Sequence, residues 1–157
     1  MAKRVRIGDV IEIPTAKGLA YAQLSHNVKR WGSLLRILPG FRASRPERFS
    51  DLVGQKERFV VFFPLQAAVN RNIFEVVEHE EVPEHARPLP LFRAAGFIDR
   101  EGHVHDWWLW DGETNRKIGN LDDETRKLPM LEVWNDTLLI QRIEEEWTPA
   151  TDHRSQG

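Results

Sequence analysis

The sequence contains no cysteine among its 157 residues. Disulfide bonds, thiolate metal sites and a cysteine nucleophile are therefore all excluded. A chain without cysteine fits a reducing compartment, and we expect a cytoplasmic protein.

Long apolar runs are also missing. The positively charged start, with Lys3, Arg4 and Arg6, is not followed by the apolar stretch that a secretory signal peptide requires. No segment approaches the roughly 18 apolar residues that span a bilayer. We therefore expect no signal peptide and no membrane contact, and a length of 157 residues fits one domain.

The sequence lacks the motifs that many enzymes carry. No Gly-x-Ser-x-Gly elbow, dinucleotide-binding glycine loop or Walker motif occurs. Ser25 and His26 are neighbours, but adjacent side chains on an extended chain diverge, which argues against a nucleophile and its base. We expect that the chain is not an enzyme and has no catalytic residues.

Metal ligands are sparse. His103 and His105 would share one face of a strand, and Asp106 follows them directly. The histidine pair supplies two ligands, whereas a closed zinc site needs four and a catalytic one usually has three. A polar entry to a strand explains the same residues, so we expect no metal and no cofactor.

The sequence does contain the alternation of short strand and helix patterns that is typical of an α+β protein. Short apolar segments bounded by glycine, proline and Asp-Gly predict strands at residues 7–14, 19–24, 33–38, 58–63, 73–77, 91–93, 105–110 and 116–119. Helical turns are predicted at residues 46–53, 65–70 and 121–127. We expect a twisted, mainly antiparallel sheet or a small, partly open barrel, with short covering helices and one longer C-terminal helix.

The C-terminal helix follows from a periodicity of 3.6 residues. Its apolar side is formed by Leu138, Leu139, Ile140, Ile143 and Trp147. Asn135 or Asp136 would cap its start. Because residues 148–157 carry no large apolar side chain, we expect a single domain over residues 1–147 and a disordered tail over 148–157.

Charge is divided unevenly along the chain. Residues 1–58 hold 12 Lys and Arg against 5 Asp and Glu, and the remainder holds 10 against 19. This asymmetry indicates a basic face for a polyanion, an acidic face for a basic partner, or two signs that interleave after folding. The basic candidates are Lys29, Arg30, Trp31, Arg36, Arg42, Arg45 and Arg48. No recognition motif accompanies them, and the isoelectric point is near 6.3, so a nucleic acid is not the expected partner.

Tryptophan is concentrated in one short segment. On a strand, Trp108 and Trp110 share one face, while Trp107 and Leu109 share the other. These residues indicate either a strand buried on both sides or a recognition patch, because tryptophan is common at interaction hot spots. Trp31 is open to the same two interpretations.

Two groups of carboxylates are candidates for partner binding. The first is Glu78, Glu80, Glu81 and Glu84, in a connector rich in proline. The second is Glu144, Glu145 and Glu146, at the end of the predicted C-terminal helix, where the helix dipole disfavours negative charge. Solvated surface charge is the alternative in both places.

The two ends of the sequence resemble the immunity protein 26 family of bacterial polymorphic-toxin systems. The resemblance rests on Ile7-Gly8-Asp9-Val10-Ile11-Glu12-Ile13-Pro14, on Ala20-Tyr21-Ala22-Gln23-Leu24 after a turn glycine, and on the C-terminal segment from Asn135 to Glu145. It implies a protein that binds and neutralises a toxin encoded beside it, often a nuclease, and it implies no catalytic residues. The alternative is an interaction module or a nucleic-acid-associated small barrel.

Overall fold

The computed structural model describes residues 4–155, which separate into two compact units. The first unit contains the described residues up to Pro88 together with Val133–Glu146. The second contains Leu89–Glu132 together with the described residues from Trp147 onward. One domain over residues 1–147 was expected from the length and from the lack of large apolar side chains after residue 147, whereas the chain leaves the first unit, builds a second sheet and returns.

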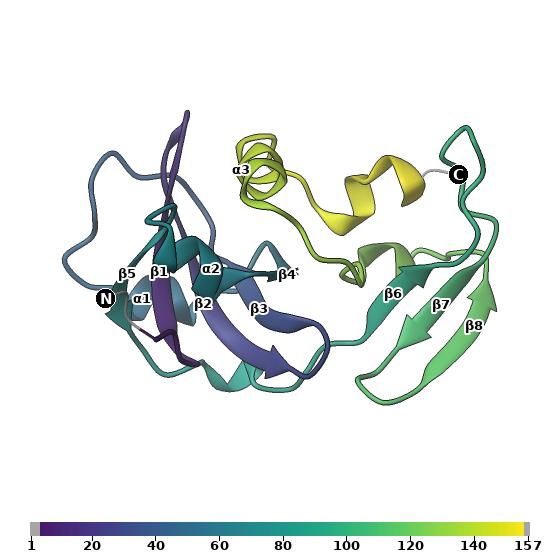
Figure 1. Ribbon diagram of the computed structural model, residues 1–157, viewed down its shortest axis with the longest axis horizontal. Coiled ribbons are helices and arrows are strands. Elements are labelled where there is room, and N and C mark those ends of the chain that lie inside the picture. Colours follow the sequence, from purple (N-terminus) through teal and green to yellow (C-terminus); the bar gives the residue numbers. More distant parts are fainter. Residues whose placement is uncertain (1–3, 156–157) are drawn as a thin grey trace. The chain divides into compact units, whose positions relative to one another are not determined.

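A five-stranded antiparallel sheet forms the first unit (Figure 1). Its strands are β1 (Asp9–Thr15), β2 (Gly18–Val28), β3 (Gly32–Ile37), β4 (Phe59–Phe63) and β5 (Glu75–His79). The first four form a meander, and β5 returns to pair with β1, which gives the order β4-β3-β2-β1-β5. Within residues 4–155 the edge strands β4 and β5 do not pair with each other, so the sheet is not a closed barrel.

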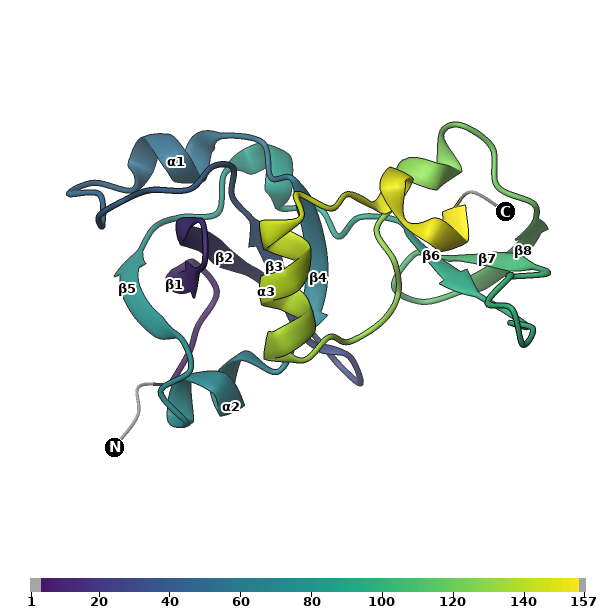
Figure 2. The ribbon, with the colours of Figure 1, turned by 90° about the horizontal axis from the view of Figure 1, so that it is seen from above.

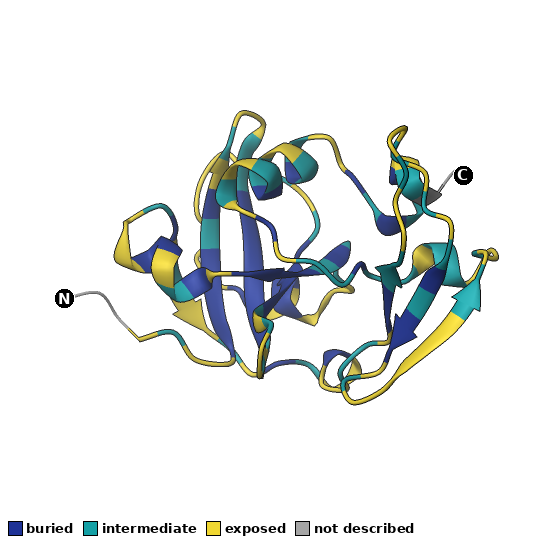
Figure 3. Cartoon of the chain, turned by 45° about the vertical axis from the view of Figure 1, so that its right-hand side comes forward, coloured by how far each residue is buried: buried dark blue, intermediate teal, exposed yellow. Residues whose placement is uncertain are grey.

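The centre of this sheet is its most buried part. Val10, Ile11 and Leu24 are fully buried on β1 and β2, as Figure 3 shows for the two strands. The pairing shifts register at two places: Val77 of β5 is an extra residue opposite β1, and Ser25 of β2 is an extra residue opposite β3. Each shift is a β-bulge, which redirects side chains and increases the local twist.

Short helices cover the sheet of the first unit. In α1 (Ser50–Gly54), Leu52 and Val53 pack with Val10 and Tyr21. The second helix, α2 (Leu65–Asn70), has the bounds expected from the sequence. Both helices are short and have no side-chain cap, so packing of their apolar residues has to hold them in place.

The C-terminal helix α3 (Asp136–Glu144) belongs to the first unit. The side chain of Asn135 caps its start by accepting a hydrogen bond from the Leu138 amide at 2.8 Å, which confirms one of the two predicted caps. Leu139 and Ile143 are buried, and the helix contacts β1 and lies across the sheet (Figure 2). The helix ends at Glu144, so Trp147 is not part of it.

The second unit contains a three-stranded antiparallel sheet. Its strands are β6 (Phe92–Ala95), β7 (Trp107–Trp110) and β8 (Asn115–Gly119), in the order β6-β7-β8. Two antiparallel sheets with a few helices confirm the predicted α+β class. The helix expected at residues 121–127 is a single 3-10 turn at Thr125–Lys127. No helix within residues 4–155 combines the length and apolar character needed to cross a membrane.

The prediction of a disordered tail is wrong for residues 148–155. These residues form two 3-10 turns, Pro149–Thr151 and His153–Ser155. Asp152 lies between the turns with 1% of its surface exposed, and it accepts hydrogen bonds from Arg154 and Trp147. The prediction failed because it counted apolar side chains, whereas buried ionic and hydrogen-bonded contacts hold this segment. Residues 156–157 lie outside the described residues.

Candidate functional site

We use the name acidic segment for residues 78–84, which run from the end of β5 to the 3-10 turn η1 (Glu84–Ala86). The Glu80 amide donates to the Gly8 carbonyl at 3.0 Å, which continues the pairing of β5 with the N-terminal strand. Glu78, Glu81 and Glu84 are exposed, and Glu80 is half-buried.

The carboxylates of the acidic segment are not neutralised by the rest of the described chain. None of the four forms an ion pair with any residue between 4 and 155, and the one hydrogen bond they make is from the His79 amide to Glu78 at 3.0 Å. All four candidates of this group therefore present free negative charge along one edge of the first unit.

An open hollow of about 410 Å³ lies beside the acidic segment. It is lined by Ile7, Ser25, His79, Glu81, Val82 and Arg87. The apolar side of the lining includes Ile7, which is 49% exposed, so a partner that enters the hollow would cover both apolar and charged surface.

A buried carboxylate positions the histidine on one wall of the hollow. Asp9 is fully buried, and its Oδ1 lies 2.9 Å from His79 Nδ1. Its Oδ2 accepts a hydrogen bond from the Arg6 amide at 3.0 Å. The His79 ring lies directly against Gly8, where a Cβ atom would come within 2.7 Å of the ring. This arrangement leaves the Nε2 atom of His79 without a partner among the described residues.

The bulge on β2 produces a contact that the sequence analysis argued against. Leu24 pairs with Leu35 and His26 pairs with Leu34, so Ser25 is the extra residue. Its Oγ lies 2.8 Å from His26 Nδ1, and His26 Nε2 lies 2.7 Å from the Arg87 carbonyl oxygen. The argument that the two side chains diverge is wrong here, because it assumes a regular strand.

The carboxylates at the end of α3 are engaged within the first unit. Glu144 accepts a hydrogen bond from the Ala16 amide at 2.6 Å, and Glu145 accepts one from Gln141 at 2.9 Å. Glu146 is paired with Arg58 at 3.3 Å. These partners stabilise negative charge at the end of the helix, and Glu144 and Glu145 are consequently less available to a partner than the acidic segment.

The tryptophan strand β7 is largely internal to the second unit. Trp110 is 8% exposed and packs on Phe92, while Trp107 is 4% exposed and lies under the Arg93 guanidinium. Trp108 is half-buried and donates through its indole N–H to Asp106 at 3.0 Å. The strand is thus packed on both sides, and Trp110 does not contribute to an exposed face.

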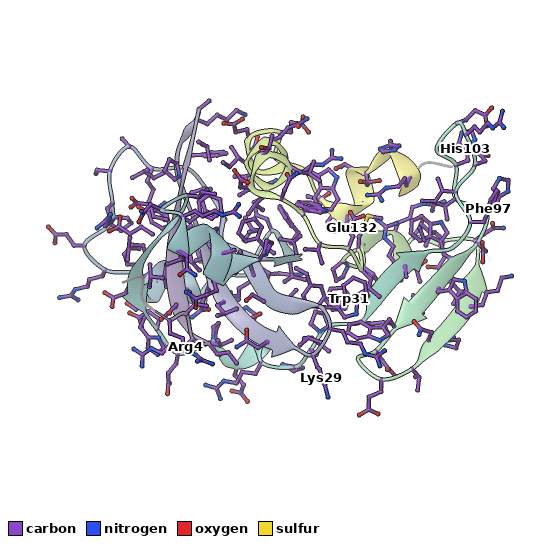
Figure 4. All side chains as sticks on the ribbon, in the orientation of Figure 1. Arg4, Lys29, Trp31, Phe97, His103 and Glu132 are labelled. Atoms are coloured by element: carbon purple, nitrogen blue, oxygen red, sulfur yellow. The ribbon has the colours of Figure 1, made fainter. Side chains whose placement is uncertain are left out.

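The remaining tryptophan candidate, Trp31, lies in the first unit. It occupies the turn between β2 and β3 next to Lys29 (Figure 4), where it is half-buried and stacks on Phe62 with a centroid separation of 5.8 Å.

The loop between β6 and β7 brings together two histidines of the second unit, His103 and His105. His105 Nε2 lies 2.9 Å and His103 Nδ1 3.7 Å from the same oxygen of Asp99. A hydrogen bond from the His103 amide, followed by further hydrogen bonds, lowers the pKa of Asp99. Asp106 is turned toward the Phe97 amide, at 2.9 Å, and so does not join the two histidines.

Phe97, 66% exposed, projects from this loop together with His103 (Figure 4). Between residues 4 and 155 no group of three or more His, Asp or Glu side chains is arranged to hold a metal ion.

The basic residues are not collected into one face. Lys29, Arg30 and Trp31 lie at one end of β2, whereas Arg42 pairs through its backbone with Leu19 at the other end. Arg45 is bound to Glu12 at 2.8 Å and to Glu75 at 3.1 Å, and the Arg45 hydrogen bond lowers the pKa of Glu12. The structure therefore interleaves charges of both signs in this region, as one of the three interpretations of the charge asymmetry expected.

No family model, no curated protein and no solved structure matches this chain. Its function therefore has to be inferred from the geometry of the two units.

Proposed function

We propose that this chain is an immunity-type binding protein that neutralises a cognate bacterial toxin by direct occlusion. The observation that supports this proposal is the acidic segment, whose four exposed or half-exposed carboxylates have no cationic partner among residues 4–155. Unpaired charge of one sign attracts a partner of the opposite sign and accelerates association.

The chemistry of the acidic segment favours a basic partner. A nuclease has to attract phosphates and so carries a cationic active-site surface, which a row of carboxylates can cover. The adjoining hollow, with Ile7 and Val82 in its lining, supplies apolar surface that such a partner would also bury. We propose that the partner is a toxin domain encoded nearby and that both proteins meet in the cytoplasm. A nucleic-acid-binding role has less support, because the basic candidates are spread along β2 and Arg45 is neutralised within the chain.

The test is a rescue experiment in a bacterial host. Toxin-domain genes that flank the gene for this chain are expressed with and without it, and surviving colonies are counted. Survival that depends on this chain supports the proposal, and the absence of rescue for every flanking gene product contradicts it.

The binding surface is tested by replacing Glu80, Glu81 and Glu84 with lysine. The matched control replaces three exposed glutamates whose carboxylates are unpaired, Glu47, Glu101 and Glu113, with lysine, so that the change in net charge is the same. We expect the first variant to associate at least about tenfold more slowly at low salt, and the difference to shrink at higher ionic strength. Equal association rates for both variants would remove the acidic segment from the interface. Because charged side chains on edge strands limit aggregation, the substitutions could cause self-association. The size of both variants in solution is therefore first compared with that of the unmodified chain.

A further inference from the structure

One residue in the lining of the hollow, Ser25, is hydrogen-bonded to a histidine behind it, His26, in the geometry of a nucleophile and its base. Ser25 lines the hollow with 5% of its surface exposed, and its Oγ lies 2.8 Å from His26 Nδ1. Hydrogen-bond contact between a hydroxyl and an imidazole is the first requirement for nucleophilic catalysis by serine.

The direction of this hydrogen bond follows from the other ring nitrogen. His26 Nε2 lies 2.7 Å from the Arg87 carbonyl oxygen, which can only accept. In the neutral imidazole, Nε2 must therefore carry the hydrogen, and Nδ1 keeps its lone pair. Ser25 consequently donates its hydroxyl proton toward His26. The other acceptor near Ser25 Oγ, the Leu34 carbonyl, is more distant at 3.3 Å.

The three groups have the roles that a hydrolytic triad requires. Ser25 is the nucleophile, His26 is the base, and the Arg87 carbonyl holds the tautomer and orientation of the base. The Arg87 side chain lines the same hollow and donates through Nε to the Val82 carbonyl at 2.9 Å. Its two terminal amino groups have no partner within residues 4–155, so they are free to bind an anionic group.

We propose that the hollow is a hydrolytic site for small carboxylic esters that carry an anionic group. Ser25 Oγ bonds to the ester carbonyl carbon while its proton passes to His26 Nδ1. The tetrahedral intermediate then breaks its bond to the alcohol oxygen, and the alcohol leaves with that proton. Water attacks the resulting acyl-serine, His26 accepts a proton from the water, and Ser25 recovers its own as the acid is released.

His79, Glu81 and Val82 of the acidic segment line the hollow, but none of them takes part in the hydrolysis, so this activity would be additional to toxin binding. It would also revise the expectation that the chain is not an enzyme. That expectation depended on the absence of sequence motifs and on the divergence of neighbouring side chains, and the bulge at Ser25 removes the second reason.

The experiment is covalent labelling of the full chain with a fluorophosphonate. Attack by Ser25 forms an oxygen–phosphorus bond and expels fluoride, and the adduct is located by mass spectrometry of the intact chain and its peptides. We expect one adduct at Ser25, none in S25A, and labelling slowed roughly 100-fold or more in H26Q. The matched control S33A removes a half-buried serine of β3 that has no histidine partner, and it should label like the unmodified chain.

Further measurements separate catalysis from a structural role of the same residues. Labelling of Ser25 in the unmodified chain is itself a measurement that requires no variant to fold. The R87Q variant should raise the KM for a nitrophenyl ester with a free carboxylate more than the KM for nitrophenyl acetate. The absence of an adduct at Ser25, or equal labelling of folded H26Q, would overturn the proposal.

Discussion

The C-terminal segment offers the sharpest test of the structure, through Asp152. Burial by itself raises the pKa of this carboxyl, but hydrogen bonds from Arg154 and Trp147 outweigh it and bring the pKa from 3.8 to about 2. Each pKa unit corresponds to 1.36 kcal/mol, so the lowering of the Asp152 pKa corresponds to about 2.5 kcal/mol of folding stability when the carboxyl is ionised. Asparagine imitates the neutral carboxyl, so D152N should lower the free energy of unfolding of the second unit by about 2 kcal/mol at pH 7.

The pH dependence has a definite sign. The folded pKa is lower than the unfolded one, so the stabilisation by Asp152 is complete above about pH 4 and disappears as the pH falls toward 2. The difference in stability between the unmodified chain and D152N should therefore shrink between pH 4 and pH 2.

Urea unfolding followed by tryptophan fluorescence measures both quantities, because the Trp147 indole donates to Asp152 at 3.2 Å. The control is D123N, since Asp123 is 97% exposed and its ion pair with Arg126 should contribute little. Equal stability of D152N and the unmodified chain at pH 7 would refute the packing of residues 148–155 and restore the tail expected from the sequence.

Two further predictions concern the first unit, and urea unfolding measures both. G8A should cost about 2 kcal/mol, because Gly8 has φ of +104° and an added Cβ would lie 2.7 Å from the Glu80 carbonyl oxygen. G32A is its control, with φ of +93° but no atom within 4 Å of the added Cβ, and equal losses would exclude the contact as the cause. R36M should cost about 3 kcal/mol, because the Arg36 guanidinium is fully buried and its removal leaves Glu57 and the Val53 carbonyl without their donor. If the free energy of unfolding fell by less than about 1 kcal/mol, an apolar side chain of similar size would be shown to replace Arg36 adequately.

Most strands and helices could be predicted because local patterns specify them. Phe59–Phe63 is apolar on both faces and lies between a charged segment and a proline, and it forms β4. Asn135 precedes an amphipathic stretch and caps α3. In each case the signal lies within a few residues, where side-chain alternation, capping and proline act directly on the backbone.

The division into two units and the position of the C-terminal segment could not be predicted in the same way. Trp147 was assigned to the C-terminal helix by its spacing, yet it belongs to the second unit, where it binds Asp152. Arg93 donates to the carbonyl of Pro149, 56 residues away. Contacts between such distant positions leave no periodicity in the sequence.

Some features of the candidate site likewise follow from the sequence, and others follow only from the tertiary structure. From the sequence alone come the absence of cysteine chemistry, the α+β class and the presence of four carboxylates in one connector. The tertiary structure decided that these carboxylates stay unpaired, that those of α3 are used internally, and that Trp110 is buried. It also placed Ser25 against His26, because the register of β2 with β3 shifts by one residue at that position. The direction of a side chain on a strand depends on hydrogen bonds to a neighbouring strand, and only the folded sheet determines those bonds.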